Sequence, residues 1–279
     1  MRLDSHQHFW NYTANPDDFS WMSADFAALK FNFLPDDLAP LLESVGIDGS
    51  IAVQARELQV ETDFLLDQAK QSAFVHGVVG WVDLCELDVE KVLEAYTEEP
   101  LLKGFRMLVH DHPDINFADS TAHARGVGLL EKHGWSYDLL LKTVHLPAAI
   151  NLVDRFPQQM FVVDHIAKPV PDGSDWIPWQ KGIVEIARRP NVYCKLSGMV
   201  TEAVWSNWQA PDYNRYLDEV FNAFGAERCM YGSDWPVCTC ATDYRSMYSV
   251  VNNWAARLSE SEQQSLFGGS CENFYRVRV

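Results

Sequence analysis

The chain has 279 residues, of which 47% are hydrophobic and 22% are charged, values typical of a globular protein that buries a large core. Its formal net charge of −17 gives a surface that repels nucleic-acid phosphates and anionic lipid headgroups. The first residues lead into polar sequence without a long apolar run. We therefore expect no nucleic-acid or membrane partner and a cytoplasmic location.

Short apolar runs rich in β-branched residues alternate with longer stretches of helical periodicity, which is the pattern of repeated strand–helix units. The predicted strands are 2–8, 50–54, 75–82, 102–108, 136–141, 160–165, 192–196 and 229–233. The predicted helices are 35–45, 61–72, 88–97, 121–132, 147–156, 179–187, 213–224 and 244–258, and Ser259 to Glu262 matches a capping box for one further helix. Eight units predict an α/β fold, a single (β/α)8 TIM barrel over residues 1–279, with an open doubly wound sheet as the alternative.

Active sites of such barrels lie at the C-terminal ends of the strands, so the residues that end each predicted strand are the candidates for an active site. The first strand ends in His6-Gln7-His8. Because side chains alternate along a strand, both imidazoles lie on one face, where they can share one metal ion or one substrate oxygen. The alternative is a pair of core or surface histidines.

Titratable residues also end the sixth and eighth predicted strands, as His165 and Asp234. A carboxylate at the end of an apolar strand is costly to bury alone, so Asp234 is expected to pair with a metal, a histidine or a bound water. The alternatives are a helix N-cap for Asp234 and a structural histidine for His165.

Two polar residues, Arg106 and Gln54, end the fourth and second strands and can direct hydrogen-bond donors into the barrel mouth. Arg106 is predicted to bind a carbonyl, carboxylate or hydroxyl of the substrate, and the alternative is a salt bridge at the barrel rim. Lys195, within the seventh strand, could equally be an interior cation paired with a carboxylate.

Tryptophans gather where a barrel would bind its substrate. Their aromatic faces suit the C–H faces of sugar-like rings, and Trp21 and Trp235 are predicted to bind substrate, whereas loop packing is the alternative for each. The segment 11–33 is a predicted lid that contains Tyr12, Phe19 and Trp21. Seven of the ten tryptophans fall at or just after strand ends: Trp10, Trp21, Trp176, Trp179, Trp205, Trp208 and Trp235.

Several segments together resemble the amidohydrolase superfamily, and within it the branch of sugar-lactone hydrolases that includes L-fuconolactonase and L-rhamnonolactonase. The resemblance covers nearly the whole chain. The segments are Asp4-x-His6-x-His8-Phe9-Trp10, Lys103-Gly104-Phe105-Arg106, Asp164-His165-Ile166-Ala167-Lys168-Pro169, Lys195-Leu196-Ser197-Gly198, Gly232-Ser233-Asp234-Trp235-Pro236 and Glu272-Asn273-Phe274-Tyr275-Arg276.

The resemblance implies hydrolysis of an aldonolactone. Either one divalent ion, zinc, binds to His6, His8 and Asp234, or no metal is used, as in some relatives such as the pyrone-dicarboxylate lactonase. Asp234 would activate water, and the histidines, with His165, would hold the metal or the developing oxyanion. Two-metal members of the superfamily use histidines that end the fifth and sixth strands. Here no histidine ends the fifth strand, and His145 comes only after it, so a two-metal centre is not expected.

Two other classes of function remain open from the sequence. One is a mononuclear-metal decarboxylase of an aromatic or unsaturated acid on the same barrel, which carbon dioxide release would identify. The other is an inert barrel that binds a sugar acid as a sensor, which tight binding without turnover would identify. The chain has no Gly-x-Ser-x-Gly elbow, Walker A loop or His-Glu-x-x-His segment, so serine-hydrolase, phosphotransfer and zincin functions lose support.

Overall fold

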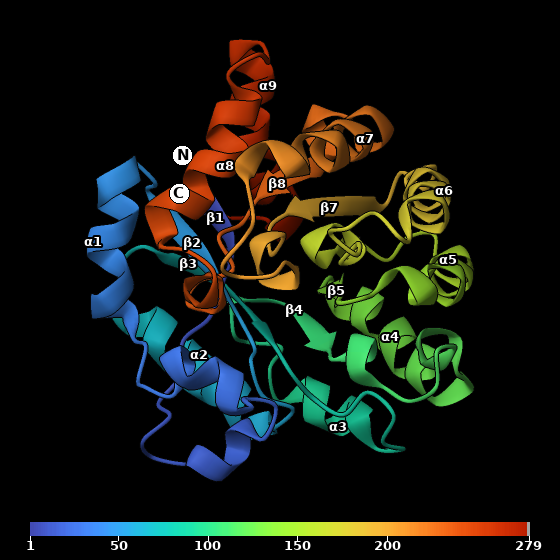
Figure 1. Ribbon diagram of the computed structural model, residues 1–279. Helices are drawn as coiled ribbons and strands as arrows, with labels where there is room; N and C mark the ends of the chain where they lie inside the picture. The colour runs from blue at the N-terminus through green and yellow to red at the C-terminus, as the bar shows by residue number, and fades with distance from the viewer. Residues whose placement is uncertain (278–279) are drawn as a thin grey trace.

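A computed structural model describes residues 1–277 of the chain and contains one parallel sheet in which each strand pairs with the next along the sequence (Figure 1). The strands are β1 Leu3–Gln7, β2 Gly49–Val53, β3 Val75–Gly80, β4 Leu102–Met107, β5 Ser136–Leu139, β6 Phe161–Val163, β7 Val192–Leu196 and β8 Cys229–Tyr231. Just beyond β8 the sheet closes on β1, where Gln7 bridges Trp235 and the His8 N–H donates to the Trp235 carbonyl at 2.7 Å. The predicted single (β/α)8 barrel is confirmed.

The helices surround the strands, as Figure 1 shows. They are α1 Pro35–Val45, α2 Gln59–Gln71, α3 Val89–Glu94, α4 Thr121–His133, α5 Leu146–Arg155, α6 Trp176–Ile186, α7 Asn214–Phe224, α8 Tyr244–Ala255, α9 Glu260–Gln264 and α10 Ser270–Tyr275. The predicted capping box is confirmed, because the Ser259 hydroxyl accepts from the Glu262 N–H at the start of α9. Within residues 1–277, no helix is both long enough and apolar enough to cross a membrane.

The last helix, α10, contributes to the interior of the barrel. Its Cys271, Phe274 and Tyr275 form one buried cluster with strand residues that include Leu3 and Met230. Apolar contact with the strands thus fills this part of the barrel, which is the usual way that such interiors are packed. The C-terminal segment is therefore a part of the barrel core.

The sixth and eighth strands end earlier in the structure than in the sequence-based prediction. Residues 160–165 form a strand only over Phe161–Val163, and residues 229–233 only over Cys229–Tyr231. Beyond these points the chain takes up left-handed backbone conformations, at His165 (φ 52°) and at Asp234 (φ 60°). A left-handed residue cannot continue a strand, so each strand stops before the residue predicted to be functional.

The segment 11–33 after β1 folds into two short 3₁₀ helices, Pro16–Phe19 and Ala24–Leu29. They enclose a small core of their own, and Arg56 lies over the Phe19 ring. This segment is therefore a packed cover beside the barrel mouth. Its core residues are Trp10, Phe19, Met22, Leu29 and Ala55.

Candidate active site

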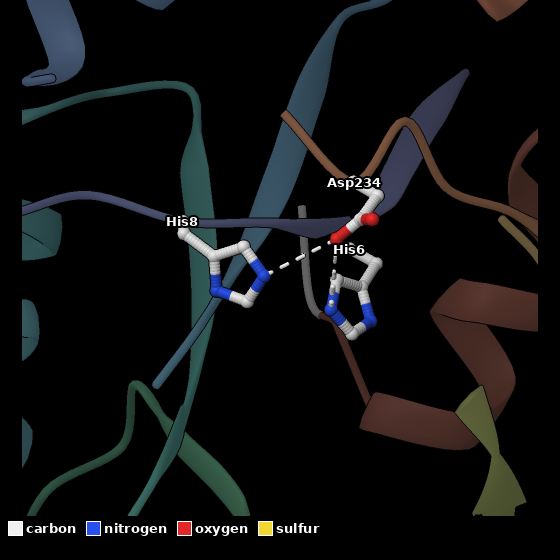
Figure 2. A group of neighbouring side chains, drawn as sticks. All are labelled: His6, His8 and Asp234. Atoms are coloured by element: carbon white, nitrogen blue, oxygen red, sulfur yellow. Dashed lines mark ion pairs between the residues drawn. The ribbon is translucent and has the colours of Figure 1, made fainter. Parts of the chain in front are cut away.

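Three imidazole nitrogens surround one carboxylate oxygen at the C-terminal end of the barrel. The Oδ1 atom of Asp234 lies 3.4 Å from His8 Nε2, 3.7 Å from His165 Nε2 and 3.9 Å from His6 Nε2. Figure 2 shows His6, His8 and Asp234 with both rings directed at the carboxylate. All four side chains are buried. The structure therefore brings together these four residues, which sequence analysis placed on three separate strands.

Left-handed backbone turns hold two of these side chains in place. His165, Ile166, Ala167 and Lys168 all have positive φ, between 45° and 60°. Each such residue costs roughly 1–2 kcal/mol, so the turn persists only because its surroundings hold it. The Trp179 indole N–H, which donates to the Ile166 carbonyl at 2.7 Å, is one such constraint.

Gly198 is a further constraint on this turn. It has a φ of +65°, and a Cβ added there would lie 2.5 Å from Cγ and Nδ1 of His165. Only glycine leaves room for the ring at this approach and adopts this backbone conformation without strain. The segment Lys195-Leu196-Ser197-Gly198 therefore matters for the packing of His165, and not only for the end of β7.

Hydrogen bonds orient the histidine rings toward Asp234. His8 Nδ1 lies 2.7 Å from the Val53 carbonyl, which can only accept, so this nitrogen carries a proton and Nε2 points at Asp234. Burial lowers the pKa of His6 and of His165 well below the ordinary value. Burial acts to raise the pKa of Asp234, but His165 and His8 outweigh it and the pKa is lowered, so the carboxyl is ionised.

These residues fit a divalent metal ion. Histidine nitrogens and carboxylate oxygens bind Zn²⁺ at about 2.0–2.2 Å, which places neighbouring ligands of a tetrahedral site about 3.3 Å apart. The ligand atoms of His6, His8 and Asp234 lie within 4.8 Å of one another. The hydrogen bond from His8 Nδ1 to a carbonyl is the outer contact typical of a metal-binding histidine.

A second group of possible ligands, His6, Asp164 and His165, is equally close but is already neutralised. Lys195 Nζ lies 2.9 Å from Asp164 Oδ1, and Arg106 donates to Asp164 Oδ2 at 2.9 Å. Both oxygens of this carboxylate therefore face protein cations. The arrangement favours one metal ion over two.

A buried ion network lies under the four residues. Lys195 Nζ lies 2.5 Å from Asp138 Oδ2 and 3.1 Å from His6 Nδ1, and the Tyr275 hydroxyl of α10 donates to Asp138 at 2.7 Å. Lys195, Asp138 and Asp164 have no exposed side-chain surface. Lys195 is thus an interior cation paired with carboxylates, as the sequence analysis allowed.

Arg106 reaches the site, whereas Gln54 supports it. The Arg106 Nη1 atom lies 3.2 Å from His6 Nε2, and the guanidinium also donates to the Gln54 side-chain oxygen at 2.8 Å and to the Gln54 carbonyl. Arg106 lines the cavity described next, but Gln54 is fully buried and does not. The structure therefore places Gln54 behind Arg106 and not among the residues that line the cavity.

A cavity of about 340 Å³ opens above Asp234. One side is apolar and includes Trp21 and Phe26 from the segment 11–33. The other carries charged and polar groups from the loops after β4, β5, β6 and β7. The lining residues are His8, Trp21, Phe26, Ala55, Arg106, Leu108, His110, Asp111, Leu140, Lys142, His165, Lys168, Thr201, Glu202, Asp234 and Val237.

The tryptophans divide between the cavity and the protein core. Trp21 lines the cavity, as predicted for a substrate-binding residue. Trp235 is 3% exposed and packs edge-on against Phe9 and Phe33, so the structure does not bring it to the cavity. Trp235 lies next to Asp234 in the sequence, and the barrel closes there, through the bridge between Trp235 and Gln7.

Sequence analysis missed several cavity or network residues, among them Asp138, His110 and Glu202. Asp138 had a usable signal, because a charged residue inside a barrel strand must find a partner. His110 and Glu202 lie in short 3₁₀ turns beyond β4 and β7, where no sequence pattern marks them. His145, whose role was open, caps such a turn by accepting from the Lys142 N–H at 3.1 Å.

A closed barrel with His-x-His on its first strand, a histidine after the sixth and an aspartate after the eighth defines an enzyme of the amidohydrolase type. The profile of the family described as Amidohydrolase matches residues 3–277, and the chain belongs to this family.

Particular relatives are similar over nearly the full length. The chain is 39% identical to an L-fucono-1,5-lactonase of Burkholderia multivorans and 34% identical to one of Burkholderia ambifaria, in both cases over 99% of this chain and 96% of the relative. A crystal structure of an amidohydrolase from Burkholderia multivorans with bound zinc matches with a TM-score of 0.94 and 38% identity, covering 100% of both chains.

Proposed function

We propose that this protein is a lactonase that hydrolyses a sugar-derived lactone to the sugar acid, with L-fucono-1,5-lactone as the first substrate to test. The observation that carries the proposal is the buried Asp234 carboxylate, whose Oδ1 atom lies 3.4–3.9 Å from three imidazole nitrogens and which lines a cavity. Relatives named as L-fucono-1,5-lactonases support the same substrate class.

Lactone hydrolysis needs a base for water, a group that polarises the carbonyl and a proton for the ring oxygen. Asp234 Oδ1 faces the imidazoles, which leaves Oδ2 to accept a proton from water. The same carboxyl then carries a proton that it can return to the departing ring oxygen. Arg106, which lines the cavity, would stabilise a developing oxyanion by its charge, and His165 is positioned to donate toward it.

His6, His8 and Asp234 would hold a single divalent ion, and we propose zinc because the similar Burkholderia multivorans structure contains it. When bound, the ion would polarise the carbonyl and lower the pKa of a bound water. The three side chains would keep their present outer contacts, including the one from His8 to the Val53 carbonyl.

The two sides of the cavity suit a sugar lactone. Trp21 and Phe26 offer aromatic surface to the C–H faces of a sugar ring. Lys168 and Glu202, on the other side, offer both donors and acceptors to hydroxyl groups. A purely aromatic substrate would make no use of these hydrogen-bonding groups.

The test is proton release, followed with a pH indicator, from a panel of aldono-1,4- and 1,5-lactones. The purified protein is assayed before and after chelation and after zinc is added back, and carbon dioxide is measured in separate reactions with aromatic acids. Asp234→Asn should lower kcat by about 100- to 10,000-fold, whereas Asp36→Asn, on the exposed first turn of α1, should not. Failure of the wild type to open any lactone would refute the proposed function.

A further inference from the structure

One lysine of the cavity takes no part in the chemical steps proposed above. Lys168 follows His165 by three residues, and its Nζ lies 2.6 Å from Glu202 Oε1. The two side chains are 16% and 26% exposed, and both line the cavity beside Asp234. They come from different loops, after β6 and after β7.

The backbone at Lys168 is costly. Its φ is 45°, and it is the last of four consecutive left-handed residues, with its N–H donating to the His165 carbonyl at 2.8 Å. The surface pair Lys132–Glu90 has a similar separation of 2.9 Å without a left-handed backbone at either residue. A strained turn that places both His165 and Lys168 in one cavity is a sign of function.

Lys168 lines the same cavity as Asp234 and His165. The other cavity lysine, Lys142, is 46% exposed and pairs with Asp111 at 3.2 Å, so it belongs to the cavity rim. Lys168 is thus the lysine placed near the reacting atoms.

Its donors are available. An ammonium has three N–H groups, of which one bonds to Glu202, so two remain for a substrate. Arg106, by contrast, already donates to Asp164 and to Gln54. The group that leaves in lactone hydrolysis is an alkoxide, a poor leaving group whose negative charge a nearby cation would stabilise.

We propose that Lys168, oriented by Glu202, is a catalytic residue that binds the ring oxygen of the lactone and stabilises it as it leaves. Water attacks the carbonyl carbon and gives its proton to Asp234. The ring C–O bond then breaks, its electron pair stays on the ring oxygen, and the proton held by Asp234 passes to that oxygen. Lys168 donates hydrogen bonds throughout and keeps its own protons. This proposal rests on the proposed lactonase function.

The test compares two leaving groups in the same enzyme. An aldono-1,5-lactone releases an alkoxide, whereas dihydrocoumarin, an aryl lactone, releases a phenolate that needs little stabilisation. Lys168→Met should lower kcat about 100-fold or more on the aldonolactone and less than about tenfold on dihydrocoumarin. Lys168→Arg, which keeps the charge, should retain most of the activity, and Lys132→Met on the surface should change neither rate.

The outcomes separate this inference from the proposed function. Equal losses on both substrates, or no loss on the aldonolactone, would overturn the role of Lys168 while lactonase activity stands. If the wild type does not open dihydrocoumarin, Lys168→Ala is assayed on the aldonolactone with added ethylammonium. A rise in kcat with amine concentration then supports the role, and its absence overturns it. If the wild type opens no lactone, both proposals fall.

Discussion

The ion network inside the barrel leads to a prediction about Lys195. Barrel interiors are usually filled by layers of branched aliphatic side chains. Here Lys195 and Arg106 are balanced by Asp138 and Asp164, without exposed surface at the lysine or either carboxylate. Lys195→Met would fill nearly the same space but would remove one of the two positive charges.

The expected loss follows from the partners left behind. Asp164 would keep Arg106, whereas Asp138 would keep the Tyr275 hydroxyl, which donates at 2.7 Å. Removing one partner of a buried ion pair costs about 3–5 kcal/mol. We therefore expect Lys195→Met to lower the free energy of unfolding by about this amount at pH 8.

Acidification should reduce this loss. Burial raises the pKa of Asp138 to about 6 even with Lys195 present, and without the cation the pKa rises further. A carboxyl whose folded pKa is raised contributes stability at low pH, and that contribution is lost as pH rises through the folded pKa. The variant should therefore lose less stability at pH 5 than at pH 8.

Urea unfolding, followed by tryptophan fluorescence at both pH values, measures the effect in Lys195→Met, Asp138→Asn and the double variant. The double variant leaves no unpaired charge on this pair, so it should recover most of the loss at pH 8. Lys132→Met on the surface serves as the control. A loss below about 1 kcal/mol, or the same loss at both pH values, would refute the electrostatic reasoning.

Burial lowers the pKa of His123 to about 4, and the stability that this histidine contributes is present above about pH 6.5 and lost toward pH 4. Between pH 7 and pH 4 the wild type should therefore lose about 3 kcal/mol of unfolding free energy that His123→Gln does not. Gly198→Ala should reduce both activity and melting temperature more than Gly225→Ala, because both glycines have positive φ but only Gly198 has its added Cβ against His165. Zinc at about 100 times its Kd should stabilise the wild type by about 2.7 kcal/mol in a thermal-shift assay, and Asp234→Asn should lose most of this.

The fold was predictable because each strand–helix unit shows its own periodicity. The predicted first helix, 35–45, matches α1, and the predicted seventh strand, 192–196, matches β7. The ends of β6 and β8 were not predictable, because the left-handed residues that follow them are not glycines. They are His165 to Lys168 after β6 and Asp234 after β8. Tertiary contacts, and not local propensity, impose this conformation.

The candidate site was predictable in part. Alternation along β1 was enough to place His6 and His8 on one face. The contacts of Lys195 with Asp138 and Asp164 join β7 to β5 and to the turn after β6, so no local pattern reveals them. Position at a strand end also does not reveal how deeply a side chain is buried. The position of Gln54 behind Arg106 could therefore not be predicted.

The distribution of charge explains why a cation fits beside Asp234. Arg106 donates to Asp164, and Lys195 pairs with both Asp138 and Asp164, so the two deep cations are already balanced. Within residues 1–277, the groups within ion-pair distance of Asp234 are three histidines, and burial lowers the pKa of His6 and of His165. A buried carboxylate that faces only imidazoles is costly. A divalent ion would offset that cost and use the imidazole lone pairs, so the charge balance favours the metal-assisted form of the proposed reaction.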